Sequence, residues 1–551
     1  MQKPIHALPM LRTMTGSTFN EDMEQKMLEA VAATIEGDGL WWYNIEGSPW
    51  REAYQMDQVW PNSQARLIVT LLDRHKYDGN ARWLDLAERL AEGLARIALR
   101  DEDRAWFFTT FTRPEGWRMD VRPHSGTVRE RTLSEPPGVS FYDVGIPLRA
   151  FSRWYAVSGD EKALDMAHRL ARFMLKPTMW APSEGPSMVT GHEHGHWGDD
   201  HFHSHTMAVM GLLEYATSTN HKRLQRFVAD FYEYSRNFGI SRIVFFPAVI
   251  GPVEQIQNSN LKNFKGKGQV SEGCAAADMT WLATALSEAG VGDYWEDVDQ
   301  YVRNQLVEFQ LLRRDLLEQT IAAGPRHEID PLAETDEDVL ERSIGSFTSG
   351  GDPTILYAWW AMCCTTNIPV SLYKVWKAIV RETDGVAQVN LLLNRALPGL
   401  DVDSYLPYEG KVVLRNKTAR KLHLRIPHWA DKKAVRCQVN DREISPCWLN
   451  NNLSIESLGK DDVITVEFPM VETTEKDTEA SYAREYTCRF KGNTLMDISP
   501  RAERPEWKQS TSDDGSQLEV GRGYPIYLRD HFKETRAPLK KVQRYVSPSI
   551  I

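Results

Sequence analysis

Four residues from two distant stretches of the chain offer the donor atoms of a metal site. Glu272 and Cys274 lie two positions apart, and Cys363 and Cys364 follow some 90 residues later as sequence neighbours. One carboxylate and three thiolates form a tetrahedral donor set that suits zinc. The alternative is that the cysteines are buried apolar thiols, the usual state of a free cysteine. Spacing leaves both interpretations open, because no Cys-x-x-Cys pair is present.

A second group of candidate residues is rich in histidine. Six of the fifteen histidines lie between residues 192 and 205. Their His-x-His spacing beside acidic residues could chelate a second metal ion. The other interpretation, which we favour, is that a few of them hydrogen-bond a substrate, with His194, His203 and His205 as the candidates.

Aromatic residues beside polar ones form a third group. Trp42, Tyr142 and Asp143 lie near the expected starts of helices, as does the pair Asp57-Gln58. Flat aromatic faces and carboxylates suit the C–H faces and hydroxyl groups of sugars. Ordinary packing of these side chains is the alternative.

The elements that would position these residues are predicted to be helical over residues 1–383. Apolar helices followed by a Gly/Asn/Asp turn and an amphipathic helix start near residues 65, 145, 205 and 275. The apolar helices suit an inner ring, and the amphipathic ones suit an outer ring. Hairpins this long favour a closed (α/α)6 toroid over an open solenoid, whose repeats are shorter. The ends of the inner helices would then line a central funnel where a functional site is expected.

Residues 384–551 change to the two-residue period of β-strands. Short strands separated by Gly, Asn, Asp and Pro predict an antiparallel β-sandwich. The strands are expected at 386–393, 411–415, 421–426, 435–439, 453–455 and 463–468, with a further hairpin at 486–498.

Composition narrows the class of protein. A net charge of -11 argues against a nucleic-acid partner, which would need a basic face. The sequence contains no run of about 18 apolar residues, so we expect no membrane partner. The first residues lack the apolar core of a secretory signal, so the cytoplasm is the expected location. The 18 Trp and 19 Tyr residues fit a carbohydrate partner, although a large helical core also uses them.

Several motifs resemble glycoside hydrolase family 127, which is typified by β-L-arabinofuranosidases. The resemblance covers roughly residues 140–530 and rests first on the Glu-x-Cys of Glu272 and on the Cys-Cys-x-x-Asn that begins at Cys363. Strings of the expected sandwich add to it: 389–391, 424–429, 439–440 and 492–495.

The resemblance implies roles for individual residues. Glu272, Cys274, Cys363 and Cys364 match the family's zinc ligands, and Cys363 matches its nucleophile. A zinc-bound thiolate would attack the anomeric carbon in a retaining, two-step hydrolysis. Glu254, 18 residues before Glu272, lies close to the sequence position of the family's general acid. His205 corresponds to a histidine that contacts the sugar.

Two other functions would also account for these residues. A sugar epimerase or polysaccharide lyase on an (α/α) toroid would use the histidine-rich segment for acid–base chemistry. A non-catalytic sugar-binding protein would hold its metal for structure alone. Fold does not separate these functions, because function depends on the site. If the chain oligomerises, a homodimer is the assembly that we expect.

Overall fold

A computed structural model describes most of the chain. The described residues are 2–43, 57–107, 110–112, 116–118, 141–176, 201–248, 271–322, 337–357, 360–479, 484–501, 510–511, 517–518 and 523–525. Within them, no helix combines the length and apolar character that crossing a membrane requires.

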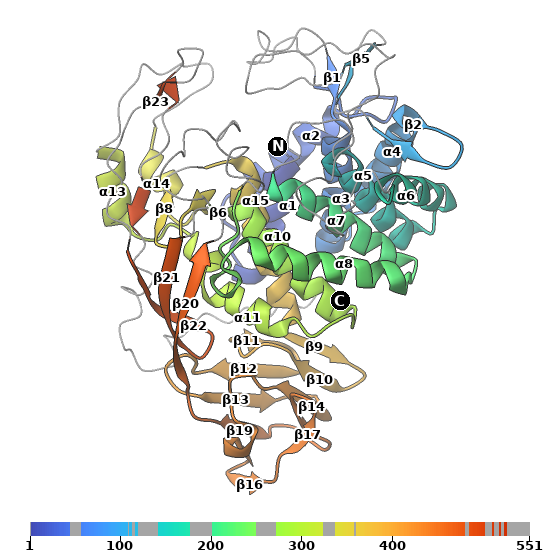
Figure 1. The fold of residues 1–551 in the computed structure, drawn as a ribbon. Helices are drawn as coiled ribbons and strands as arrows, with labels where there is room; N and C mark the ends of the chain where they lie inside the picture. The colour runs from blue at the N-terminus through green and yellow to red at the C-terminus, as the bar shows by residue number, and fades with distance from the viewer. Residues whose placement is uncertain are drawn as a thin grey trace.

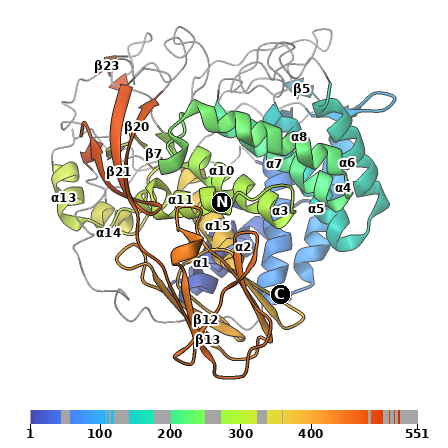
Figure 2. The same ribbon diagram turned by 60° about the horizontal axis from the view of Figure 1, so that its bottom comes forward.

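Six helices of the described chain form a closed inner ring (Figures 1 and 2). Each helix packs against the next, and α1 closes the ring by packing against both α3 and α15. In ring order they are α1 (Gln2–Thr15), α3 (Pro61–Asp78), α5 (Phe141–Ser158), α7 (Phe202–Ser218), α10 (Gly273–Glu288) and α15 (Met362–Ala378). The (α/α)6 toroid predicted from the sequence is confirmed.

An outer layer of helices covers five of the six inner ones. Each outer helix packs on the inner helix that precedes it. They are α2 (Glu21–Ala33), α4 (Arg82–Ile97), α6 (Glu161–Met174), α8 (Lys222–Ser235) and α11 (Trp295–Arg303). On α6 the buried positions fall at residues 163, 166, 167, 170, 171, 173 and 174, which is the single stripe of an amphipathic helix.

The turns between paired helices follow from their sequences. After α5, Gly159 adopts a left-handed φ of 71° and donates its N–H to the Tyr155 carbonyl. Asp160 then caps α6 by accepting a hydrogen bond of 2.9 Å from the Lys162 N–H. Glycine ends a helix without steric strain and aspartate begins one, so the Ser-Gly-Asp string reverses the chain.

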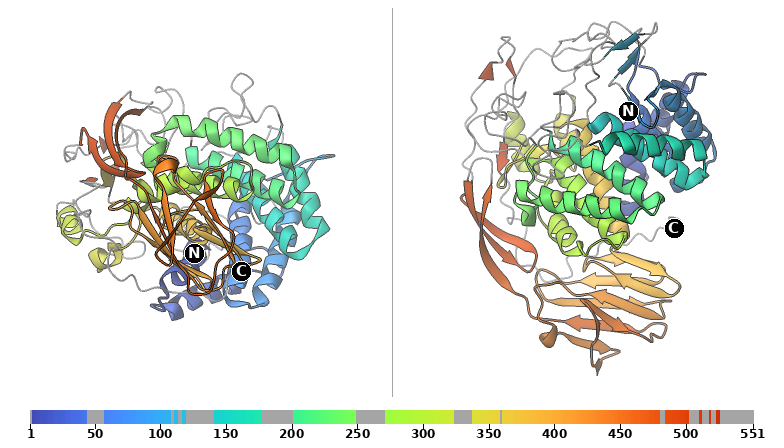
Figure 3. Two further views of the ribbon diagram at one scale, coloured as in Figure 1. Left: turned by 90° about the horizontal axis from the view of Figure 1, so that it is seen from below. Right: turned by 45° about the vertical axis from the view of Figure 1, so that its right-hand side comes forward.

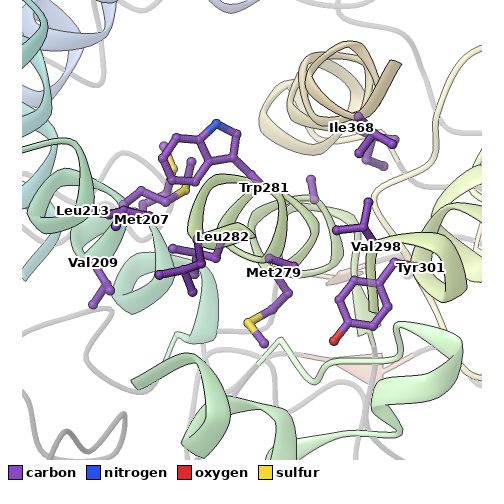
Figure 4. Close-up of a cluster of buried hydrophobic side chains, with 14 of the residues drawn as sticks. Met207, Val209, Leu213, Met279, Trp281, Leu282, Val298, Tyr301 and Ile368 are labelled. Atoms are coloured by element: carbon purple, nitrogen blue, oxygen red, sulfur yellow. The ribbon is translucent and has the colours of Figure 1, made fainter. Parts of the chain in front are cut away.

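The inner helix α10 is buried on nearly every side. Figure 4 shows Met279, Trp281 and Leu282 of α10 pointing in different directions from one helix. They meet side chains from three neighbouring helices: Val209 of α7, Tyr301 of α11 and Ile368 of α15. The helix is therefore held by packing on all sides, which fixes the position of its first turn.

Shorter elements lie between the paired helices. Those outside the site are α12 (Gln305–Glu308), α13 (Arg314–Ala322), α14 (Val339–Ser343), β1 (Gln58–Val59), β2 (Leu99–Arg100), β3 (Ala105–Trp106), β4 (Thr110–Thr112) and β5 (Gly116–Arg118). Strands β1, β4 and β5 form one small sheet, and β2 pairs with β3.

The helices α5 and α7 approach each other through small residues. A Cβ atom added to Gly211 would lie 2.1 Å from the Gly145 carbonyl oxygen, and one added to Gly145 would lie 2.3 Å from the Ala208 Cα. Both obstacles are backbone or Cα atoms, which cannot move without separating the helices. The glycines therefore set the distance between these two ring members.

Replacement of Gly211 by alanine is expected to destabilise the protein by about 1–3 kcal/mol, because overpacking outweighs the gain in helix propensity. Chemical unfolding of the purified variant measures the change. Gly37→Ala is the matched control, since nothing lies within 4 Å of its added Cβ. Equal stability of the two variants would show that the close approach does not matter.

Two sheets form the β-sandwich at one end of the ring (Figures 1 and 3). The first contains, in spatial order, β17 (Cys447–Leu449), β18 (Asn452–Ile455), β14 (Lys421–Arg425), β10 (Val386–Val389) and β9 (Val380–Thr383). The second contains β11 (Arg395–Ala396), β12 (Leu400–Ser404), β13 (Lys411–Asn416), β19 (Val463–Glu467), β15 (Arg436–Val439) and β16 (Arg442–Ile444).

One strand pair differs from the antiparallel prediction. Strands β10 and β14 are parallel, with Val386 opposite Lys421 and Val389 opposite Leu424. Parallel neighbours need a long connection, and here the chain passes through β11, β12 and β13 of the other sheet before it returns. The other pairs of these two sheets are antiparallel.

A third sheet lies beside the ring instead of in the sandwich (Figure 1). It consists of β20 (Glu472–Glu479), β21 (Arg484–Lys491) and β22 (Thr494–Ser499). Asn493 in its last turn donates hydrogen bonds of 2.7 Å to Glu296 and 2.8 Å to Asp299 of α11. These contacts tie the third sheet to the toroid.

Candidate metal centre and active site

The six inner helices all begin at the same end of the ring. One cavity is lined by each of them, through a residue at its fifth or sixth position: His6, Arg66, Ile146, Met207, Asp278 and Asn367. Equivalent positions can meet around one axis only if the helices run in the same direction. The first turns therefore surround the axis together, and their N-terminal dipoles favour negative charge there.

The first turns of α10 and α15 bring together the four predicted metal ligands. One ligand atom each from Glu272, Cys274, Cys363 and Cys364 lies within 4.8 Å of the others. The Sγ atoms of Cys274 and Cys364 are 3.2 Å apart, and those of Cys363 and Cys364 are 3.8 Å apart. The Sγ of Cys364 lies 3.5 Å from Glu272 Oε1. These four groups could hold one metal ion.

Local backbone structure explains how residues at awkward spacings converge. Glu272 ends the short strand β6 (Ser271–Glu272) with an extended conformation, and Cys274 is the second residue of α10. The change from strand to helix between them turns both side chains toward one point. Cys363 and Cys364 lie in the first turn of α15, after the extended residue Ala361.

A small sheet beside the site connects the starts of the two helices. Strand β6 pairs with β7 (Gly350–Gly351), which pairs with β8 (Ile355–Tyr357), and β8 pairs with β25 (Gly523–Pro525). Just before β7, the Ser349 carbonyl accepts a hydrogen bond of 2.9 Å from the Gly273 N–H. The Ser349 hydroxyl accepts another from the Ala361 N–H. Ser349 thus joins the backbone that precedes both halves of the cluster.

Two polar side chains orient the candidate ligands from outside. The His201 ring lies 2.5 Å from Glu272 Oε2 through its Nε2, and its Nδ1 lies 3.1 Å from the Ser204 hydroxyl. The Asn367 amide donates to Cys274 Sγ at 3.3 Å. Partners of this kind fix the rotamers of metal ligands and tune their affinity.

Replacement of His201 by alanine is expected to weaken metal binding about 10- to 100-fold, which is the usual cost of losing such a partner. Competition with a chromophoric chelator measures the affinity. His75→Ala, near the other end of α3, serves as a control and should leave it unchanged. An unaltered affinity in the His201 variant would show that the contact with Glu272 plays no part in binding.

The electrostatic environment distinguishes the three sulfur atoms. Burial raises the pKa of the Cys274 thiol and that of the Cys364 thiol, because both side chains are fully buried. Hydrogen bonds from Cys274 and Cys364 lower the pKa of Cys363, and the positive charge of Lys3 adds to this effect. Cys363 is only half-buried. The least buried cysteine of the cluster is thus the one whose pKa is lowered.

The carboxylate of the cluster is also ionised. Burial alone would raise the pKa of Glu272, but the charge and hydrogen bond of His201 outweigh it and the pKa is lowered. Binding of a divalent ion would then require proton loss chiefly from Cys274 and Cys364, so it should release protons.

Two of the proposed substrate-binding histidines lie in the first turn of α7. His203 is buried, and its Nδ1 lies 2.7 Å from Asp278 Oδ2, an atom that also accepts a hydrogen bond of 2.7 Å from the Thr206 hydroxyl. His205 is 2% exposed. Both residues lie at the end of the ring that carries the cluster, and neither is among the residues that line the axial cavity.

The remaining candidates have varied positions. Asp143 is buried in the first turn of α5, where it accepts a hydrogen bond of 3.1 Å from Asn62. Tyr142 is in the same turn, and its side chain is outside the described part. Trp42 precedes α3 and is buried, with its indole N–H bound to Asp38 at 3.0 Å. His194 and Glu254 lie outside the described residues.

Reasoning from the sequence did not single out His201 or Asp278. His201 belongs to the histidine-rich segment, where six similar residues gave no reason to select it. Asp278 stands four residues after Cys274 and so on the same face of α10, a spacing that could have indicated it. Ser349 gave no sequence signal, because its carbonyl and its hydroxyl act on backbone N–H groups that only the folded chain brings near.

The toroid and the β-sandwich place the chain in a class of (α/α)-toroid proteins with an added β portion, of which structures are known. No family model and no curated protein matches the chain. The solved structure of a β-L-arabinofuranosidase of family 127 from Geobacillus stearothermophilus T6 is similar, with a TM-score of 0.55 and 14% identity over 90% of this chain and 75% of that one.

Two further structures have the same fold. A β-arabinofuranosidase of family 127 matches with a TM-score of 0.58 and 16% identity, over 96% of this chain and 85% of the other. A protein described as a glycoside hydrolase matches with a TM-score of 0.56 and 13% identity, over 94% and 82%. The resemblance to family 127 that the motifs indicated thus extends to the whole fold.

Proposed function

We propose that this chain is a retaining glycoside hydrolase with a zinc-bound cysteine nucleophile. The observation that carries the proposal is the cluster itself: three thiols and one carboxylate meet where six helices begin. Among these ligand residues Cys363 is the least buried, so it is the one that a substrate can reach. The shared fold of glycoside hydrolases from family 127 supports the same assignment.

The donor set and its spacing fit zinc. Sulfur atoms placed about 2.3 Å from a tetrahedral zinc ion lie about 3.8 Å from each other. The Sγ separations of 3.2 Å and 3.8 Å and the S–O separation of 3.5 Å are close to this value. Thiolates favour zinc over magnesium or calcium, which prefer oxygen. A bound zinc ion would supply the positive charge that keeps the thiols ionised.

In the first step, Cys363 Sγ would attack the anomeric carbon of the sugar. A C–S bond forms as the glycosidic C–O bond breaks, and the leaving oxygen takes a proton from a general acid. We propose Glu254 as that acid, on its position in the sequence. The lowered pKa of Cys363 favours the thiolate, which is the nucleophilic form.

In the second step, the same carboxylate would take a proton from water. The water oxygen then bonds to the anomeric carbon as the C–S bond breaks, which regenerates the Cys363 thiolate and the protonated acid. Two displacements at one carbon retain its configuration. His203, His205 and Asp143, at the same end of the ring, are proposed to hold the sugar.

The substrate is proposed to be a β-L-arabinofuranoside or a related sugar. Hydrolysis of a panel of nitrophenyl glycosides that includes β-L-arabinofuranoside tests this, with proton NMR of the first-formed sugar to read its configuration. Hydrolysis with retention supports the proposal, and inversion would exclude a covalent Cys363 intermediate. Sugar isomerisation or β-elimination without hydrolysis would indicate an epimerase or a lyase, and sugar binding without any product would indicate a binding protein.

A further inference from the structure

The cavity on the ring axis is distinct from the metal ligands and adjoins them. It has a volume of about 50 Å³, which is room for about four water molecules or for a small charged group. Asn367 lines it and also donates a hydrogen bond to Cys274 Sγ. Asp278 lines it from α10, one turn beyond the cluster. Lys3 lines the cavity and also acts electrostatically on the Cys363 sulfur, so we place a sugar bound at Cys363 beside this cavity.

The lining of the cavity is unusually cationic. Lys3, Arg66 and Arg149 contribute positive side chains from three different inner helices, whereas Asp278 contributes the one carboxylate among the lining residues. That carboxylate already accepts hydrogen bonds from His203 and Thr206. His6 also lines the cavity, but burial lowers its pKa, so it is neutral near pH 7.

Arg149 and Lys3 differ in whether a carboxylate of the protein already pairs with the positive charge. Arg149 pairs with Glu214 at 2.9 Å and lies over the Trp281 ring, 5.1 Å from its centroid. Lys3 is half-buried, and its ammonium group forms no ion pair with any carboxylate of the described residues. An ammonium group that faces a cavity and has no carboxylate partner is suited to bind an anion that enters the cavity.

We propose that this cavity binds the carboxylate of an acidic sugar, with Lys3 as the main anion-binding residue and Arg66 and Arg149 supporting it. The inference rests on the proposed function, since the sugar is placed by its anomeric carbon at Cys363. It narrows the substrate proposed above, a β-L-arabinofuranoside or a related sugar, to a glycoside of a uronic acid. A neutral sugar would offer Lys3 only hydroxyl oxygens, whereas a carboxylate would form an ion pair and a charge-assisted hydrogen bond with it.

An alternative role for Lys3 is to offset the charge of the cluster. Three thiolates, one carboxylate and a divalent ion leave net negative charge, which a nearby ammonium group would stabilise. That role would affect every substrate and metal binding alike. The anion-binding role affects only substrates that carry a carboxylate, so paired substrates separate the two roles.

The test compares nitrophenyl uronides with the matching neutral glycosides, in wild type and in Lys3→Met. We expect wild type to prefer uronides, and the variant to lose about 10- to 100-fold in kcat/KM on them, mainly through KM. Its loss on neutral glycosides should be at least about tenfold smaller, because only the effect of the Lys3 charge on the Cys363 sulfur is lost there, and its metal content should stay within about twofold of wild type. Lys26→Met is the matched control, because Lys26 is 70% exposed on the outer helix α2.

Calorimetric binding of D-glucuronate and D-galacturonate gives a readout that does not depend on catalysis. If wild type binds these uronates and Lys3→Met does not, the inference is supported even when no glycoside is hydrolysed. A failure to hydrolyse any glycoside would rule out only the proposed function. Wild-type hydrolysis of neutral glycosides alone would overturn the acidic substrate and leave the hydrolase intact. Equal losses on neutral and acidic substrates in the variant, or no uronate binding, would also overturn it.

Discussion

Replacement of Cys363 by serine is expected to lower kcat/KM at least about a thousandfold. A serine hydroxyl at this position would be a poorer nucleophile and a poorer leaving group than the thiolate, so both displacements would slow. The side chains of serine and cysteine are close in size, and Cys363 is only half-buried, so the fold should persist. Steady-state kinetics on the best nitrophenyl glycoside measures the loss.

The matched control for this variant is Cys447→Ser, because Cys447 is exposed on strand β17 of the sandwich. It should keep wild-type activity. Circular dichroism and metal analysis of the Cys363 variant separate a chemical loss from a structural one. Near-normal turnover in a folded Cys363→Ser protein would rule out the cysteine nucleophile and favour acid–base chemistry by His205 and its neighbours.

Replacement of Cys274 by alanine is expected to reduce the metal content from about one ion per chain to nearly none. Cys274 is fully buried between Cys364 and Asn367, so its loss removes one ligand and opens the site. Structural zinc sites bind with about 10–16 kcal/mol of apparent free energy, and part of it stabilises the fold. Unfolding by urea should show a loss of several kcal/mol.

The matched control is Cys437→Ala, since Cys437 is equally buried but lies in β15 of the sandwich, away from the cluster. It reports the cost of the cavity alone, which is about 1–3 kcal/mol for a side chain of this size. A chelator added to wild type should lower its stability toward that of Cys274→Ala and should not affect the variant. Equal stability and equal metal content in both variants would contradict the metal site.

Much of the toroid could be predicted because its hairpins carry strong local signals. The string Ser158-Gly159-Asp160 contains both a helix stop and a helix cap, and the helices beside it differ clearly in their apolar patterns. The helix α1 was not identified as a ring member. Pro9 lies inside it, and proline lowers the helical signal that a sequence gives.

Features that depend on contacts between distant segments were harder to predict. The parallel pairing of β10 with β14 depends on which sheet the intervening strands join, and an alternating pattern does not reveal that. The cluster of Glu272 and the three cysteines could be proposed from residue types. Its supporting groups, His201 and Ser349, act through contacts that only the folded chain brings together.

The most direct test of the account is the zinc X-ray absorption spectrum of the purified protein, recorded with its metal stoichiometry. The account predicts about one zinc ion per chain, with three sulfur ligands near 2.3 Å and one oxygen ligand near 2.0 Å. Cys274→Ala should lose this signal. A protein that binds no metal when zinc is supplied, and whose Cys274, Cys363 and Cys364 all react as ordinary thiols, would contradict it.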